Sequence, residues 1–176
     1  MAYYNIIDYI TIASTGNATD FGDRTTSGAV NQSIAACASS TRGVIGGGIV
    51  SNVMDYVTIA STGNATDFGD LTAARYALTA AASPTRGVFF KGTNVANTMD
   101  YITIASTGNA TDFGDDQVGP AGYQGACSNG TRGTAGGGNG ASNVIAYITI
   151  ASTGDTADFG DLSVSRTAPS TLSGSA

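Results

Sequence analysis

The stretch Asp100-Tyr-Ile-Thr-Ile-Ala-Ser-Thr-Gly-Asn-Ala-Thr-Asp-Phe-Gly-Asp115 occurs four times in a chain of 176 residues. The copy at 8–23 is identical, the copy at 55–70 carries one substitution, and the copy at 146–161 carries four. The tyrosines of successive copies are 47, 45 and 46 residues apart. A period of this length is typical of propeller blades and of solenoids built from helix pairs, so the local pattern has to decide between them.

The pattern inside a repeat has a period of two, which indicates strands rather than helices. Residues 54–60 alternate β-branched or aromatic side chains with smaller or polar ones. Residues 61–65 are small, polar or tolerant of positive φ, as a hairpin turn requires, and residues 66–72 can return antiparallel. A third strand is expected at 76–82 and a fourth, rich in glycine, at 85–92. The four predicted hairpins are centred on Gly16, Gly63, Gly108 and Gly154.

Four short strands per repeat predict an all-β fold, namely a β-propeller of four antiparallel repeats in a single domain. The repeats run approximately over 1–40, 41–84, 85–130 and 131–176, and the glycine-rich strand is expected to be the innermost of each. There are four hairpins but three glycine-rich strands, so the first repeat lacks its own. An open sheet edge remains unless residues 1–4 or another subunit cover it.

Composition limits the chemistry of the chain. The net charge is -6 with seven basic residues and no histidine, which argues against nucleic-acid binding, catalytic triads and zinc sites. No apolar run is long enough to span a membrane, and the start has no secretory signal pattern, so export by the general route is not expected. Cys37 and Cys127 occupy equivalent places in different repeats and are interpreted as small buried side chains rather than a disulfide.

The order of residues in a repeat resembles the kelch repeat family. A glycine pair, a tyrosine, an aromatic residue and an arginine follow one another in the kelch blade, and Gly46-Gly47-Gly48, Tyr56, Phe68 and Arg75 follow in that order here. The chain departs from the kelch pattern in having Phe for the usual Trp, a longer interval before it, Lys91-Gly92 at the glycine pair, and Pro120 in place of an arginine. The resemblance implies a kelch-like β-propeller.

The amino-acid sequence of the repeat, for example Asn64-Ala-Thr-Asp-Phe-Gly-Asp-Leu-Thr72, also resembles that of repeat-bearing virion structural proteins of marine tailed bacteriophages. That resemblance implies a non-enzymatic tail, fibre or head-decoration component located in the virion, with other virion proteins or copies of itself as partners. A carbohydrate-binding module that recognises a host-surface glycan is the alternative. A glycan-active enzyme is a third hypothesis, and the nearly identical repeats offer no single divergent blade that could carry its active site.

Three sets of repeated residues are candidate functional residues, and no catalytic, cofactor-binding or metal-binding residue is predicted. Arginines at one position could form a ligand site or interface, although a structural bond to a carboxylate or carbonyl is the stronger interpretation. The tyrosines could stack on sugars but are expected to pack between blades, together with the repeated phenylalanines. These sets are Arg42, Arg86 and Arg132; Tyr9, Tyr56, Tyr101 and Tyr147; and Phe21, Phe68, Phe113 and Phe159.

Pairs of aspartates close each hairpin. They are Asp20 and Asp23, Asp67 and Asp70, Asp112 and Asp115, and Asp158 and Asp161. Oxygen ligands of this kind suit calcium, but the spacing lacks the dense acidic alternation of calcium loops. A turn-stabilising role is therefore preferred, with calcium as an open alternative and no cofactor expected.

Overall fold

The structure, a computed structural model, describes residues 5–26, 33–49, 51–95, 97–117 and 122–172, and these contain fourteen β-strands and no helix. The predicted all-β class is therefore confirmed. The strands form one two-stranded and three four-stranded antiparallel sheets. The interpretations that residues 1–4 supply a strand and that Pro120 replaces an arginine lie outside the described residues.

Each sheet is formed by strands that follow one another in the chain. The two-stranded sheet contains β1 (Ile6–Tyr9) and β2 (Thr19–Asp23). The second sheet has the order β3 (Ala35–Ala38), β4 (Arg42–Gly46), β5 (Val53–Thr58) and β6 (Thr66–Asp70). The third has β7 (Ala80–Ala82), β8 (Arg86–Phe89), β9 (Thr98–Thr103) and β10 (Thr111–Asp115), and the fourth has β11 (Gly125–Ser128), β12 (Arg132–Gly136), β13 (Ser142–Thr149) and β14 (Ala157–Arg166).

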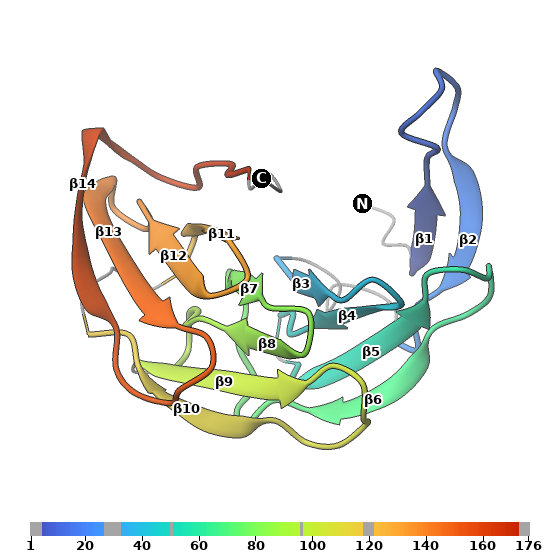
Figure 1. The fold of residues 1–176 in the computed structure, drawn as a ribbon, viewed down its shortest axis with the longest axis horizontal. Coiled ribbons are helices and arrows are strands. Elements are labelled where there is room, and N and C mark those ends of the chain that lie inside the picture. Colours follow the sequence, from blue (N-terminus) through green and yellow to red (C-terminus); the bar gives the residue numbers. More distant parts are fainter. Residues whose placement is uncertain (1–4, 27–32, 50, 96, 118–121, 173–176) are drawn as a thin grey trace.

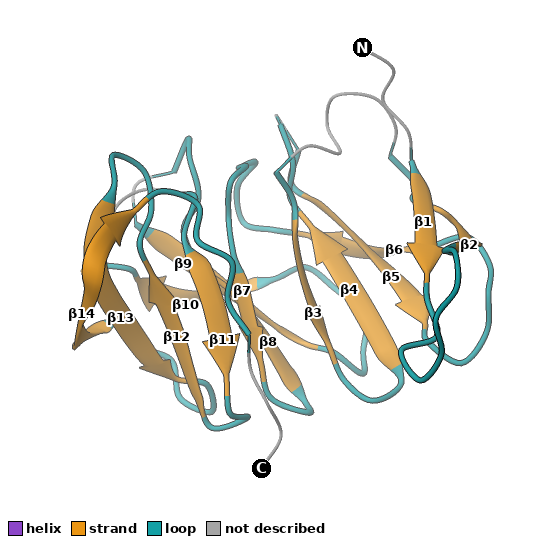
Figure 2. Cartoon of the chain, turned by 90° about the horizontal axis from the view of Figure 1, so that it is seen from above, coloured by secondary structure: helices purple, strands orange, loops and turns teal. Residues whose placement is uncertain are grey.

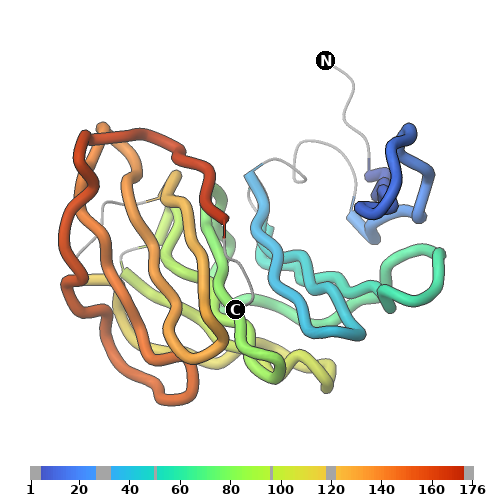
Figure 3. The backbone as a smooth tube through the Cα atoms, turned by 45° about the horizontal axis from the view of Figure 1, so that its top comes forward, coloured from blue at the N-terminus to red at the C-terminus, as the bar shows by residue number. Residues whose placement is uncertain are grey.

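The sheets stand side by side in a curved array (Figure 1). The strands β3, β7 and β11 face one another on the concave side, and β2, β6, β10 and β14 form the outer edge (Figure 1). Figures 2 and 3 show the β1–β2 sheet and the β14 sheet at opposite ends of the array. No strand pairing joins these two end sheets among the described residues, so the array has two end faces.

The expectation that the glycine-rich strand is innermost is wrong. In every four-stranded sheet it is the second strand (β4, β8 and β12), and a short strand of small residues lies inside it. The glycines serve contacts between sheets: a Cβ on Gly87 would lie 2.4 Å from Sγ of Cys37, and a Cβ on Gly133 would lie 2.9 Å from Cβ of Ala81. The inner strand of one sheet therefore occupies the space that glycine leaves on the next sheet.

A β-bulge at the repeated phenylalanine shapes the outer edge of each sheet. In the second sheet Asp55 pairs with Asp67 and Met54 pairs with Gly69, so Phe68 has no partner on β5. The same shift occurs at Phe21, Phe113 and Phe159. The glycine after each phenylalanine has φ between 133° and 146°, a region that side chains rarely adopt. The bulge turns Phe68 out of its own sheet and toward the next one.

The hydrophobic core lies between neighbouring sheets. One cluster joins Val44, Met54 and Phe68 of the second sheet to Phe89 and Ile104 of the third. A second cluster joins the third sheet to the fourth in the same way and contains Val88, Phe113, Ala135, Ile148 and Ile150. Because each sheet is covered by its neighbour, the apolar residues of a repeat are buried only when another repeat follows or precedes it.

Candidate functional site

The recurring site of this protein is the junction between successive repeats, where the hairpin loop of one repeat meets the outer strand of the repeat before it. At the junction between the second and third sheets, the N–H of Gly108 donates to the carbonyl of Phe68 (2.7 Å) and the N–H of Ala110 to the carbonyl of Asp70 (2.8 Å). Equivalent pairs join Gly63 to Phe21, Ala65 to Asp23, Gly154 to Phe113 and Thr156 to Asp115. The hairpin loop thus bonds to the outer edge of the preceding sheet, which blunts that edge.

A third bond of the junction uses the residue after the turn glycine. The N–H of Asp70 donates to Oδ1 of Asn109 (3.1 Å), and equivalent bonds run from Asp23 to Asn64 and from Asp115 to Asp155. The substitution of Asn by Asp155 in the last repeat preserves the bond, because an amide oxygen and a carboxylate oxygen both accept.

The candidate arginines each stack on the tyrosine of their own sheet, with Cζ 4.2 to 4.5 Å from the ring centroid. Arg42 also donates from Nη1 to the carbonyl of Ile104 (3.0 Å), and Arg86 donates to the carbonyl of Ile150 (3.1 Å). Both arginines therefore reach across a junction to a backbone carbonyl of the next repeat. Arg132 is exposed and stacks on Tyr147 and Phe159.

Each repeated tyrosine packs edge-on against the repeated phenylalanine of its own hairpin. Their ring centroids lie 6.0 to 6.1 Å apart in all four repeats, a favourable aromatic geometry. Phe68 and Phe113 are buried in the two core clusters, Phe21 is half-buried, and Phe159 is exposed at the end of the array. The structure therefore brings one arginine, one tyrosine and one phenylalanine together in each four-stranded sheet, at a junction in the second and third sheets and at the exposed end in the fourth.

Buried ion pairs lie behind the hairpins. Arg24 pairs with Asp55 (2.9 Å), and Arg75 pairs with Asp100 (2.8 Å). Thr72 donates its N–H and its hydroxyl to the same Asp100 carboxylate, at 2.9 and 2.7 Å. Burial lowers the pKa of the Arg75 guanidinium, and the nearby Asp100 charge opposes that shift. Arg24 follows the outer strand of the first sheet and pairs with an aspartate of the second sheet. Arg75 follows the outer strand of the second sheet and pairs with an aspartate of the third sheet.

The last junction uses a different pair. Ala146 stands where the earlier repeats have Asp55 and Asp100, and Asp116 accepts from Thr156 Oγ1 (3.0 Å) instead. Lys91 lies 3.8 Å from the Asp116 carboxylate and donates to its main-chain carbonyl (2.8 Å). Burial lowers the pKa of Lys91, and the charges of Asp116 and Asp115 oppose that shift. These charged residues were not predicted from the sequence, although Lys91, Asp116 and Ala146 all depart from the repeat pattern, which is a signal of a substituted pair.

The first aspartate of the pair supports the bulge in the second, third and fourth repeats. Oδ1 of Asp67 accepts from the N–H of Gly69 (3.3 Å), and Asp112 and Asp158 accept equivalently from Gly114 and Gly160. Within the described residues no group of three or more Asp, Glu, Cys or His side chains is placed to hold a metal ion. The carboxylates are thus engaged in local backbone bonds that fix the position of the phenylalanine.

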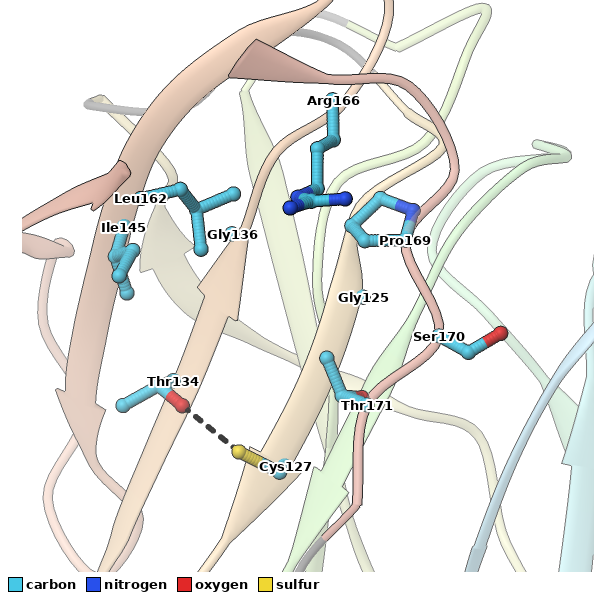
Figure 4. Close-up of a pocket in the computed structure, with 10 residues that line it drawn as sticks. All are labelled: Gly125, Cys127, Thr134, Gly136, Ile145, Leu162, Arg166, Pro169, Ser170 and Thr171. Atoms are coloured by element: carbon cyan, nitrogen blue, oxygen red, sulfur yellow. Dashed lines mark hydrogen bonds between the residues drawn. The ribbon is translucent and has the colours of Figure 1, made fainter. Parts of the chain in front are cut away.

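A pocket of about 380 Å³ opens on the fourth sheet (Figure 4). Its lining includes Cys127, Thr134, Leu162, Arg166 and Pro169. The counterparts of Cys127, Thr134 and Leu162 in the second repeat are Cys37, Val44 and Leu71, which belong to the core that the third sheet covers. There a Cβ on Gly46 would lie 3.2 Å from the ring of Phe89, whereas its counterpart Gly136 lines the pocket. The pocket is therefore the uncovered counterpart of a core cluster, and its size falls within the range of ligand sites.

The two cysteines are free thiols in different environments. Cys37 is buried against Gly87, and burial raises the pKa of its thiol to about 12. Cys127 is half-buried at the pocket and lies 3.2 Å from Oγ1 of Thr134 (Figure 4). The two thiols differ in burial because the third sheet covers Cys37, whereas Cys127 lies on the uncovered side of the fourth sheet.

Along the described parts of the chain, no helix has the length and hydropathy needed to cross a membrane. No protein-family profile matches this chain, and comparison with curated proteins gives no match either.

Proposed function

We propose that this protein is a non-enzymatic structural component of a tailed-phage virion, a kelch-like propeller module that acts through protein–protein contacts built from its repeats. The observation that carries the structural role is the junction. The repeated glycine, asparagine, phenylalanine and arginine side chains, and the backbone around them, are used to join one repeat to the next. The repeated residues are therefore explained by their part in joining repeats, and a catalysed reaction is not needed to explain them.

The charged side chains of the interior support the same proposal. Arg24, Arg75 and Lys91 each pair with a buried aspartate that fixes a segment between sheets. Removal of one partner from such a pair is costly, so these groups serve the rigidity of the array. The proposed location in the virion rests on the resemblance of the repeat sequence to phage structural proteins.

Mass spectrometry of purified phage particles tests the virion role. We expect peptides of this chain to co-purify with the particle through a density gradient, in a fixed ratio to the major capsid protein. Detection in the lysate but not in the particle fraction would overturn the proposal.

A glycan-binding role has one observation in its favour. Hollows rich in hydroxyl groups recur beside the hairpins, with volumes of about 210 and 250 Å³ at the third and fourth repeats. Each is lined by a tyrosine together with serine and threonine residues, such as Tyr101, Ser106 and Thr107. Tyrosine rings and hydroxyl groups can contact sugars, and repeated weak sites would add through multivalency. A glycan array with the purified chain separates this role from the structural one.

A further inference from the structure

The two end faces of the array expose the two halves of a junction. The tail face is the outer side of the fourth sheet, and its residues are Arg132, Phe159, Gly160, Asp161, Ser163 and Arg166. The head face is the first hairpin, and its residues are Asp8, Ile10, Ile12, Gly16, Asn17 and Ala18. With the half-buried Gly160 as the one exception, these residues are exposed. Their counterparts meet one another at the junctions inside the chain.

Apolar side chains on the two faces are complementary. Phe159 is 52% exposed, whereas the equivalent Phe68 is 2% exposed because it lies in a cluster with Ile102 and Ile104. Ile12 is 94% exposed, whereas the equivalent Ile104 is fully buried. The head face therefore presents the isoleucines that cover a phenylalanine at an internal junction, and the tail face presents an uncovered phenylalanine.

Backbone groups on the two faces are complementary as well. Inside the chain the carbonyls of Phe68 and Asp70 accept from Gly108 and Ala110. The same carbonyls on the tail face belong to Phe159 and Asp161, and the same donors on the head face belong to Gly16 and Ala18. Asn17 corresponds to Asn109, which accepts from the N–H of Asp70. In the part of the chain that the structure describes, this outer strand and this hairpin loop thus each lack the partner that they have at the internal junctions.

Gly160 is evidence that the tail face is shaped for a close backbone approach. A Cβ on Gly22, Gly69 or Gly114 would lie 2.3 to 2.5 Å from the backbone of the next turn glycine. A Cβ on Gly160 would meet nothing within 4 Å among the described residues. Its φ of 135° lies within the range of 133° to 146° that the other three glycines span, so the fourth repeat keeps the same backbone geometry without a neighbour among the described residues.

Each face carries one member of a charged pair that is joined at an internal junction. Arg166 corresponds to Arg75, since the carbonyls of both accept from the equivalent glycines Gly138 and Gly48 at 3.0 Å. Arg75 pairs with Asp100, and the counterpart of Asp100 on the head face is Asp8. The tail face therefore presents the cation, and the head face the anion, of a pair that is fully buried at an internal junction.

We propose that the tail face of one molecule binds the head face of a second copy of this chain, in a joint that repeats the internal junction. Arg166 pairs with Asp8, Ile10 and Ile12 cover Phe159, and the first hairpin bonds to the free edge of β14. The head-to-tail contact closes a ring when two copies each supply one head and one tail, and the curvature of the array in Figure 1 favours closure. The inference deepens the proposed function by naming the partner as the chain itself.

Charge reversal tests the joint. Sedimentation velocity of the unmodified chain is expected to show a concentration-dependent assembly larger than the monomer. D8R and R166D should each weaken association by about thirtyfold or more, as expected when one partner of a desolvated charge pair is lost. The double variant D8R/R166D should restore it. An equimolar mixture of the two single variants should also assemble, because each joint between two different variants contains opposite charges.

A second variant guards against misfolding as an explanation. Ile12→Asn changes an exposed side chain, so the melting temperature of the monomer should stay the same while association is weakened. A chain that is monomeric up to near-millimolar concentration, or assembles equally well with either reversed charge, overturns the inference. The virion role is tested separately by particle mass spectrometry, so a monomer found in the particle would refute the self-association and leave the proposed function standing.

Discussion

Gly69 and Gly108 are in backbone contact across a junction, so that a Cβ on Gly69 would lie 2.5 Å from the carbonyl oxygen of Gly108. Gly160 has nearly the same φ as Gly69, but none of the described residues comes within 4 Å of its Cβ position. The two glycines therefore share one backbone strain and differ in the close approach. This difference allows the two effects to be measured separately.

Substitution of each glycine by alanine should separate strain from steric overlap. Gly160→Ala is expected to cost about 1–3 kcal/mol from backbone strain alone. Gly69→Ala adds an overlap with backbone that cannot move aside, a further loss of roughly 1–3 kcal/mol. Urea unfolding at a protein concentration where the chain is monomeric measures both. Equal losses for the two variants would contradict a tight junction at Gly69.

The repeated phenylalanine should matter to stability only where another repeat covers it. Phe68→Ala is expected to destabilise the fold by about 3–5 kcal/mol, since the ring is buried between two sheets. Phe159→Ala should cost less than about 1 kcal/mol in the monomer, because its ring is exposed and its main packing is against Tyr147. Comparable losses, measured by urea unfolding, would mean that the tail face is covered in the monomer.

Asp100→Asn should destabilise the fold by about 3–5 kcal/mol, because it leaves the Arg75 charge buried without its anion. The double substitution Arg75→Met and Asp100→Leu removes both charges and should recover most of the loss. Asp112→Asn is the matched control. Asp112 is exposed, and an amide oxygen can still accept from Gly114, so we expect a change below about 0.5 kcal/mol. If thermal unfolding showed the same loss of stability for Asp112→Asn as for Asp100→Asn, a structural role for the pair would be refuted.

Cys37 should make stability depend on pH in the alkaline range. Its pKa is raised from 9.0 to about 12 by burial, so the unfolded chain loses the thiol proton at a lower pH than the folded chain. The contribution is fully present below pH 9 and is lost as the pH rises toward 12, at up to about 1.4 kcal/mol per pH unit. Cys37→Ala, which copies Ala81 of the next repeat, should remove this loss.

Urea unfolding of both proteins across that pH range measures the difference. Parallel stability curves for the two proteins would show that Cys37 is not buried. Thiol labelling provides a second readout, since Cys127 should react in the native protein at pH 8 and Cys37 only after unfolding.

The sequence by itself determined the repeat, the strands and the hairpins. Alternation over residues 54–60, turn residues around Gly63 and a return strand ending near Asp70 are local features, and local steric preferences decide them. The arginine, tyrosine and phenylalanine positions could be identified in the same way, because each recurs at a fixed place in the repeat. The sequence could not say which strand is innermost, since Thr85–Phe90 and Ala80–Ala82 are both compatible with a crowded position.

Only the tertiary structure decided what each repeated residue contacts. The pairing of Arg75 with Asp100 and the covering of Phe68 by Ile104 join residues of different repeats, and no local preference encodes which repeat supplies the partner. Three backbone bonds between repeats depend on the tertiary structure in the same way. The N–H of Ala77 donates to the carbonyl of Ser33, that of Tyr123 to Ala77, and that of Ala168 to Tyr123, and each donor residue has a φ of 50° to 57°. None of these donors is glycine, so composition gave no signal. Burial between sheets, a property of the assembled array, makes four nearly identical segments differ in exposure and leaves the head and tail faces open.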